Sequence, residues 1–174
     1  MKVTNLKPTD YYEYYELYLS VVPKDVNLID AYVQGMNQVM HFLQSIPDDK
    51  WGHRYATGKW TIAEVVQHVI DTERIFMHRC FRIARGEQAN ISGFDQDAYI
   101  PTSAANDKTP GQLIEEYKIT RDFSISLLSS LRPEDFYRKG SASGHGLSAG
   151  AAAFIILGHE IWHNQIIKDR YLAS

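Results

Sequence analysis

The chain has 174 residues, 44% of them hydrophobic, and a formal net charge of −3 from 18 Lys and Arg against 21 Asp and Glu. This length and apolar content allow one well-buried core and favour a single domain over residues 1–174. The basic side chains are scattered and form no stripe that would neutralise a phosphate backbone, so we expect no nucleic-acid partner.

The N-terminal segment lacks the apolar stretch of a signal peptide. No window approaches the roughly 18 apolar residues that span a bilayer, so we expect a cytoplasmic protein with no membrane partner.

A short helix is predicted from Tyr11 to about Ser20, with Thr9 or Asp10 as its cap and Pro23 as its stop. Its tyrosines predict an amphipathic cover for the core.

Two long helices are predicted in the first half of the chain. Apolar residues recur at helical spacing from about Asn27 to Ile46. The second helix opens with Thr61 and Glu64, whose side chains can form a capping box over the first amides. It continues unbroken to about Arg85, where Gly86 supplies the stop.

The second half of the chain predicts a long loop and two further helices. Residues 87–108 are polar and irregular, and a loop of this length is often functional. Thr109 as cap and Pro110 at the first helical position begin the third long helix, which ends before Pro133. Ser148 caps the fourth, whose first half is apolar on every side and should be buried. No alternating strand is evident, so the sequence predicts an all-α four-helix bundle with an extra short N-terminal helix.

Two histidines in the fourth long helix are the strongest chemical signal. His159 and His163 stand four residues apart, which places both imidazoles on one face, one turn apart. The spacing alone is a weak signal, but the pair ends the most apolar helix, where an unpaired imidazole would lose hydration without compensation. A metal ion is one partner for such a pair. His68, near the apolar stripe of the second helix, would face the same interior, although alone it is more often a core histidine.

The same segment reads His159-Glu160-Ile161-Trp162-His163, which matches the HExxH motif of zincin metalloproteases. In that motif the glutamate is the general base. The chain is short for such a protease and has no obvious strand-rich substrate-binding lobe. A zincin-like protease is therefore the weaker alternative.

As a whole, the chain resembles the DinB/YfiT-like family over roughly residues 28–172. Two anchoring motifs and two further segments carry this resemblance. They are Trp60-Thr61-Ile62-Ala63-Glu64 through His68-Val69-Ile70-Asp71-Thr72-Glu73-Arg74 to Arg79-Cys80-Phe81-Arg82-Ile83-Ala84-Arg85-Gly86, Gly158-His159-Glu160-Ile161-Trp162-His163 with Ile166, Gly93-Phe94-Asp95-Gln96-Asp97, and the segment from Tyr55 to Trp60.

The resemblance implies up-down-down-up connectivity and one divalent transition metal held by His68, His159 and His163. Three neutral imidazoles with an open fourth position suit zinc or nickel, with iron or manganese as further options. The resemblance also implies a metal-dependent hydrolase or a thiol transferase that uses a low-molecular-weight thiol, acting on a small-molecule substrate. Family members are often homodimers, so a homodimer is a further expectation.

Two carboxylates are candidate catalytic groups. Asp71 lies within one turn of His68 on the same face, and Glu160 directly follows His159, a position that can turn it elsewhere. Either would orient an imidazole or move a proton. The sequence does not choose between hydrolase and thiol transferase, and a metal-stabilised binding or stress-response module without turnover is the alternative.

Other residues with reactive or charged side chains are expected to be structural. Cys80 lies in a run that predicts a partly buried helix, so we expect it to pack in the core. Three arginines recur at every third residue, namely Arg79, Arg82 and Arg85. Such a basic strip could bind a carboxylate or phosphate, but a solvent-exposed helix face is the favoured interpretation. Three further histidines are expected to be exposed or capping rather than ligands; they are His53, His78 and His145.

Overall fold

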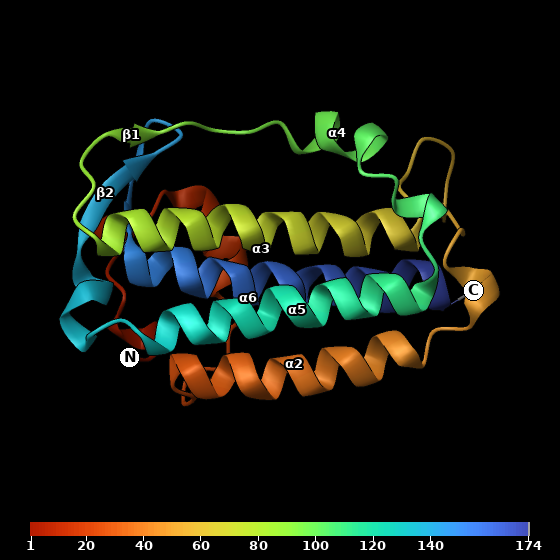
Figure 1. The fold of residues 1–174 in the computed structure, drawn as a ribbon, viewed down its shortest axis with the longest axis horizontal. Coiled ribbons are helices and arrows are strands. Elements are labelled where there is room, and N and C mark those ends of the chain that lie inside the picture. The colour runs from red at the N-terminus through yellow and green to blue at the C-terminus, as the bar shows by residue number, and fades with distance from the viewer. Residues whose placement is uncertain (174) are drawn as a thin grey trace.

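The computed structural model describes residues 1–173 and shows four long helices side by side (Figure 1). The helices are α1 (Glu16–Leu19), α2 (Leu28–Gln44), α3 (Ile62–Ala84), α4 (Gln96–Tyr99), α5 (Pro110–Ser129) and α6 (Ala149–Ile166), which continues as a π-helical stretch (Ile167–Leu172). The strands are β1 (Asn90–Ile91), β2 (Lys139–Ala142) and β3 (His145–Ser148). No helix within the described residues is long and apolar enough to cross a bilayer.

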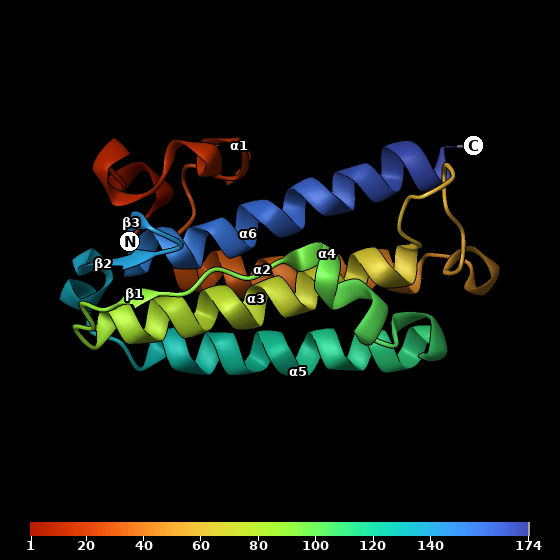
Figure 2. The ribbon, with the colours of Figure 1, turned by 90° about the horizontal axis from the view of Figure 1, so that it is seen from above.

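The long helices run up, down, down and up along the chain (Figure 1). α3 packs against both α6 and α5, and α2 packs against α5 and α6. Because α3 and α5 are parallel, a crossover spanning residues 85–109 returns along the length of α3 and carries α4 (Figures 1 and 2). The predicted fold class and connectivity are confirmed.

α3, α5 and α6 begin at the caps that the sequence predicts, whereas Asn27 makes no side-chain cap hydrogen bond at the start of α2. The Thr61 hydroxyl accepts the backbone N–H of Glu64 at 3.1 Å, and the Glu64 carboxylate accepts the backbone N–H of Thr61 at 2.8 Å. Thr109 and Ser148 cap α5 and α6 in the same way through their hydroxyls. These local hydrogen bonds satisfy amides that have no intrahelical partner, which is why the boundaries can be predicted from sequence.

Two local predictions are wrong. The N-terminal segment is not one helix from Tyr11 to Ser20, because a 3₁₀ turn (Glu13–Tyr15) precedes the four-residue α1. A small sheet is also present, in the order β1-β2-β3, although the sequence predicts no strand. Its hairpin turns at Ser143 and Gly144, whose φ angles are 53° and 81°. Turn geometry fixes this hairpin, and its Gly, Ser and Ala residues give no alternating pattern.

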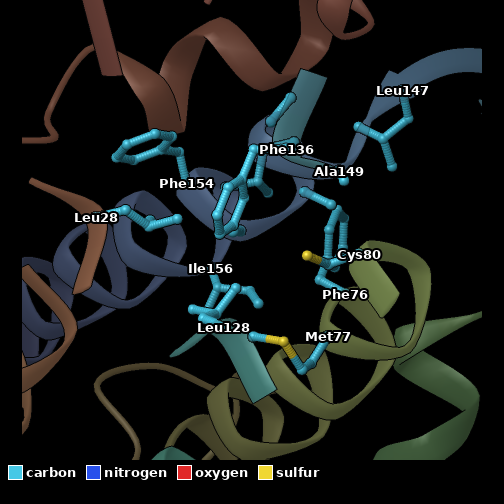
Figure 3. Close-up of a cluster of buried hydrophobic side chains, with 14 of the residues drawn as sticks. Leu28, Phe76, Met77, Cys80, Leu128, Phe136, Leu147, Ala149, Phe154 and Ile156 are labelled. Atoms are coloured by element: carbon cyan, nitrogen blue, oxygen red, sulfur yellow. The ribbon is translucent and has the colours of Figure 1, made fainter. Parts of the chain in front are cut away.

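The core is centred on α6. Every residue from Ala149 to Glu160 is buried, as the all-round apolar pattern predicts. Figure 3 shows Phe154 and Ile156 of α6 among side chains from α3, including Met77 and Cys80. Burial raises the pKa of the Cys80 thiol to about 12, so the thiol is a protonated packing group.

Candidate metal centre

Three histidines from two helices converge inside the bundle. His68 comes from α3, and His159 and His163 come from consecutive turns of α6, the helix that packs against it. One ring nitrogen from each lies within 4.8 Å of the other two. The three residues are 4%, 5% and 8% exposed, respectively. The structure therefore brings together the three residues that the resemblance implied as ligands.

All three imidazoles are held in the neutral form. Burial lowers the pKa of His68 to about 4. Burial, with the nearby His68, lowers the pKa of His163 to about 3, and burial with both neighbours lowers that of His159 well below its ordinary value. The neutral imidazole is the form that offers a lone pair to a metal, so the cluster is prepared for coordination at neutral pH.

The histidines lack the hydrogen bonds that buried polar groups normally make. Nδ1 of His163 is buried without a partner. Nε2 of His68 and Nε2 of His159 lie 3.0 Å apart, and this pair can share only one proton. Within residues 1–173, no hydrogen bond joins any of the three rings to a carboxylate. Three buried neutral imidazoles with an incomplete hydrogen-bond network fit a divalent transition metal.

Aromatic rings enclose the cluster. Trp60 contacts His68 with ring centroids 4.9 Å apart, and Tyr18 of α1 contacts His159 at 5.2 Å. α1 can approach because residue 158 is glycine: a Cβ there would overlap the backbone carbonyl of Tyr18. The sequence predicted an aromatic cover here but gave no signal that Tyr18 faces a histidine.

Two cavities reach the histidines. One, of about 210 Å³, is lined by Thr72 and His159 among others. The other, of about 320 Å³, is lined by Trp60 and His163 among others. Residues 94–97 of the crossover contribute to both, with Phe94 and Gln96 on the first and Asp97 on the second. The long irregular segment singled out in the sequence thus lines both approaches to the cluster.

Glu160 lies on another face of α6, in a buried ion-pair network. Its carboxylate accepts hydrogen bonds from Arg121 Nη2 at 2.6 Å and from the Tyr117 hydroxyl at 2.8 Å. Arg121 Nε also donates to Glu73 at 2.9 Å. Burial alone would lower the pKa of Arg121, but the Glu160 and Glu73 carboxylates raise it well above its ordinary value. This network joins α3, α5 and α6 and occupies the carboxylate for which we predicted a catalytic role.

Glu160 also lines a third cavity, of about 220 Å³, beside α2, whose lining includes none of the three histidines. Asp71 also makes its hydrogen bonds outside the histidine cluster. Its carboxylate accepts from Gln67 and Arg74, each at 3.1 Å, and does not hydrogen-bond to His68. The geometry supports neither carboxylate as a catalytic group, because each is engaged by side chains outside the cluster.

The arginines of α3 do not form one solvated strip. Arg85 is exposed and Arg82 pairs with Glu87 at 3.2 Å, but Arg79 is only 2% exposed. The solvated interpretation is therefore wrong for Arg79, whose side chain faces the cavity beside His159. Arg121 could not be predicted as a buried residue, since its spacing on α5 gives no sign that it is fully buried.

The other histidines stay outside the cluster. His53 approaches Tyr171 edge-on, and His78 is exposed. His145 is exposed and stacks on Tyr12, with ring centroids 3.8 Å apart. The exposure of His78 and His145 agrees with the role expected for them, whereas His53 is half-buried and caps no helix within the described residues.

Comparison with known proteins adds a family and a fold. Residues 31–167 match the family described as the DinB superfamily. The structure is similar to that of YfiT from Bacillus subtilis, described as a probable metal-dependent hydrolase with an unusual four-helix bundle topology. The TM-score is 0.71 at 17% identity, covering 87% of this chain and 92% of that one. Comparison with the curated proteins gives no match.

Two further solved structures share the fold. The mycothiol-dependent maleylpyruvate isomerase aligns with a TM-score of 0.66 at 14% identity, covering 81% of this chain and 60% of the isomerase. A DinB-like protein, YjoA from Bacillus subtilis, aligns with a TM-score of 0.59 at 17% identity, covering 84% of this chain and 92% of that one. At these identities the likeness concerns the fold.

Proposed function

This chain belongs to the DinB superfamily, and we propose that it is a metal-dependent transferase that joins a low-molecular-weight thiol to a small-molecule substrate. One observation carries the proposal: His68, His159 and His163 converge as buried neutral imidazoles, and two separate cavities reach them. The descriptions of two structural neighbours, one as metal-dependent and one as thiol-dependent, support it.

A divalent ion on these imidazoles, zinc or nickel in the first instance, supplies a Lewis acid that lowers the pKa of a bound thiol or water. Aromatic side chains of the chain pack against the three rings. Tyr18, Trp60 and Trp162 surround the cluster, with ring centroids 5.2, 4.9 and 4.9 Å from those of their histidines. One cavity reaches His159 and the other His163, so a thiol and an acceptor can approach the cluster through separate cavities.

Thiol chemistry suits this site better than hydrolysis. Free water is a far weaker acid than a thiol, whose pKa is roughly 8.5, so a thiol needs far less help to lose its proton. Neither predicted proton carrier, Asp71 or Glu160, hydrogen-bonds to the histidines. Thiol transfer therefore requires less proton transfer by side chains at this site than hydrolysis does.

A metal-dependent hydrolase is the second candidate. Asp97 lines the cavity beside His163, and it is the carboxylate placed to accept a proton there. If hydrolysis is the reaction, Asp97→Asn should reduce turnover at least about tenfold without changing the metal content. If thiol transfer is the reaction, the same substitution should leave turnover within about twofold.

The first experiment measures bound metal in the protein purified without a histidine tag, before and after reconstitution with zinc, nickel, manganese or iron(II). We expect near one equivalent in the wild type and loss in His68→Ala, His159→Ala and His163→Ala, with exposed His41→Ala as the matched control. Absence of metal after reconstitution would remove the basis for both enzyme candidates.

The second experiment adds a low-molecular-weight thiol to the cobalt(II)- or nickel(II)-loaded protein and records the absorption spectrum. A new thiolate-to-metal charge-transfer band supports the transferase. Hydrolysis of ester or amide substrates without such a band supports the hydrolase. Metal binding with neither result would identify the metal-stabilised module without turnover.

A further inference from the structure

Arg79 is a buried cation without an anion. Its side chain is 2% exposed, and its Nη2 donates to the Ser143 hydroxyl at 3.0 Å. The guanidinium lies 4.6 Å from the Phe76 ring centroid. Nε is buried with no hydrogen-bond partner, and Arg79 forms no ion pair with any residue between 1 and 173. Because arginine cannot neutralise itself by losing a proton, this burial is costly.

The same chain shows how a structural buried arginine is satisfied. Arg121 is 0% exposed, and its guanidinium is paired with both Glu73 and Glu160 at 2.8 and 2.6 Å. Arg79 has the Ser143 hydroxyl, the Tyr15 phenol and aromatic rings in place of two carboxylates. The contrast indicates that the anion for Arg79 comes from outside the chain.

The cavity beside Arg79 is suited to an anion. It has a volume of about 210 Å³, and none of its lining residues is acidic. The lining includes the hydroxyl-bearing side chains of Tyr14, Tyr15 and Thr72, and Thr72 Oγ1 is buried without a partner. Two unpartnered polar groups therefore face one cavity that is rich in hydrogen-bond donors.

The cavity also connects Arg79 with the histidine cluster, since His159 is part of its lining. Thr72 and Arg79 follow His68 by four and eleven residues, so the three lie near one face of α3. Eleven residues span roughly 16 Å along a helix, and helical side chains lean toward the N-terminus, which brings the guanidinium back toward the cluster.

We propose that Arg79 binds the carboxylate of the small-molecule substrate and so holds the rest of that molecule against the histidine cluster. The planar fork of the guanidinium matches a carboxylate, and its free Nε and its Nη groups can donate in parallel. The proposal rests on the function proposed above, because it assigns the substrate's chemical class at the same site. Arg79 is thus a specificity-determining residue for an organic acid.

The test uses the metal-free protein, so that its result does not depend on the metal or on turnover. Succinate is titrated into ¹⁵N-labelled wild-type protein while the Nε–H resonance of Arg79, assigned by its loss in Arg79→Lys, is followed. We expect a saturable shift of that resonance. Arg79→Lys keeps the charge but loses the fork, so calorimetry should give a dissociation constant weaker by about tenfold or more. Arg85→Gln, at the exposed C-cap of α3, should bind like the wild type.

The proposal is overturned if succinate leaves the Arg79 resonance unchanged, or if Arg79→Lys binds succinate as tightly as the wild type. Inorganic phosphate is the comparison anion, and tighter binding of phosphate than of succinate would overturn the assignment of a carboxylate. If Arg79→Lys folds poorly, side-chain correlation spectra of ¹³C,¹⁵N-labelled wild-type protein assign the Arg79 Nε–H resonance instead, so the wild-type titration still gives a decision. If the protein binds succinate but binds neither metal nor a thiol, the carboxylate site stands and the proposed function fails.

Discussion

Nε2 of His68 and Nε2 of His159 lie 3.0 Å apart although 91 positions separate the two residues in the sequence. The contact joins α3 to α6 at the point where His163 completes the cluster. All three rings are buried and neutral. Protonation or separation of the rings should therefore weaken the packing of α3 against α6. Metal binding and folding should therefore be coupled.

The metal-free protein should lose stability as the pH falls from 6.5 to 5. The ordinary pKa of histidine is 6.5, whereas burial lowers that of His68 to about 4 and that of His163 to about 3. In this window the unfolded state binds more protons, so each histidine removes up to about 1.4 kcal/mol of unfolding free energy per pH unit. The loss begins as the pH falls through 6.5 and continues down to the lowered pKa values of about 4 and about 3.

Urea unfolding at pH 7 and pH 5 measures this effect. His68→Phe should show a smaller pH dependence than the wild type, because one neutral buried imidazole has been removed. His41→Ala, which changes an exposed histidine, should keep the dependence of the wild type. Equal pH dependence in all three proteins would contradict the coupling.

Glu160→Ala should destabilise the fold but leave metal binding intact. The substitution removes one of the two carboxylates that pair with the fully buried Arg121, and breaking such a pair costs about 3 kcal/mol or more. Chemical unfolding and metal analysis measure the two properties. Asp122→Ala, which removes an exposed partner of Lys118, is the control and should cost at most about 1 kcal/mol. A stable Glu160→Ala protein with full metal but no turnover would restore a catalytic role for Glu160.

Gly158→Ala should displace α1 from α6. The added methyl group would overlap the carbonyl of Tyr18, so we expect a loss of about 1 to 3 kcal/mol in unfolding free energy and faster transfer of zinc to a chelator. Gly111→Ala is a matched helical control, because the closest atom to its new Cβ is 4.0 Å away. Unchanged stability and metal release in Gly158→Ala would show that Tyr18 does not seal the site.

Cys80 should be inert toward thiol reagents in the native protein. It is 0% exposed in the core, and burial raises its pKa to about 12, so almost no thiolate is present at neutral pH. Ellman's reagent should react with one thiol per chain only after denaturation. Rapid reaction in the folded state would place Cys80 among the candidate nucleophiles for thiol transfer.

The small sheet and the short α1 could not be predicted from local sequence patterns. The hairpin of β2 and β3 depends on positive φ angles at Ser143 and Gly144, and its short residues carry no alternation to detect. α1 is shorter than its tyrosine-rich sequence predicts, and packing against α6 fixes its position. The homodimer, the substrate and the cellular location stay predictions.

The sequence by itself determined the four long helices, the caps of three of them and the pairing of His159 with His163 on one face. Each of these depends on spacing and hydrogen bonds within a few residues of the chain. It also placed His68 near the apolar stripe of its helix. These are properties of single helices, and they are encoded locally.

Only the tertiary structure decided what faces each of those helices. Glu160 follows His159 directly, yet its carboxylate meets Arg121 from α5 rather than the cluster. Arg79 matched the spacing of an exposed strip, yet it is buried beside His159 without a carboxylate partner. Helical periodicity fixes the angle at which a side chain leaves its own helix, whereas its charge is compensated by residues distant in sequence, and these become neighbours only on folding.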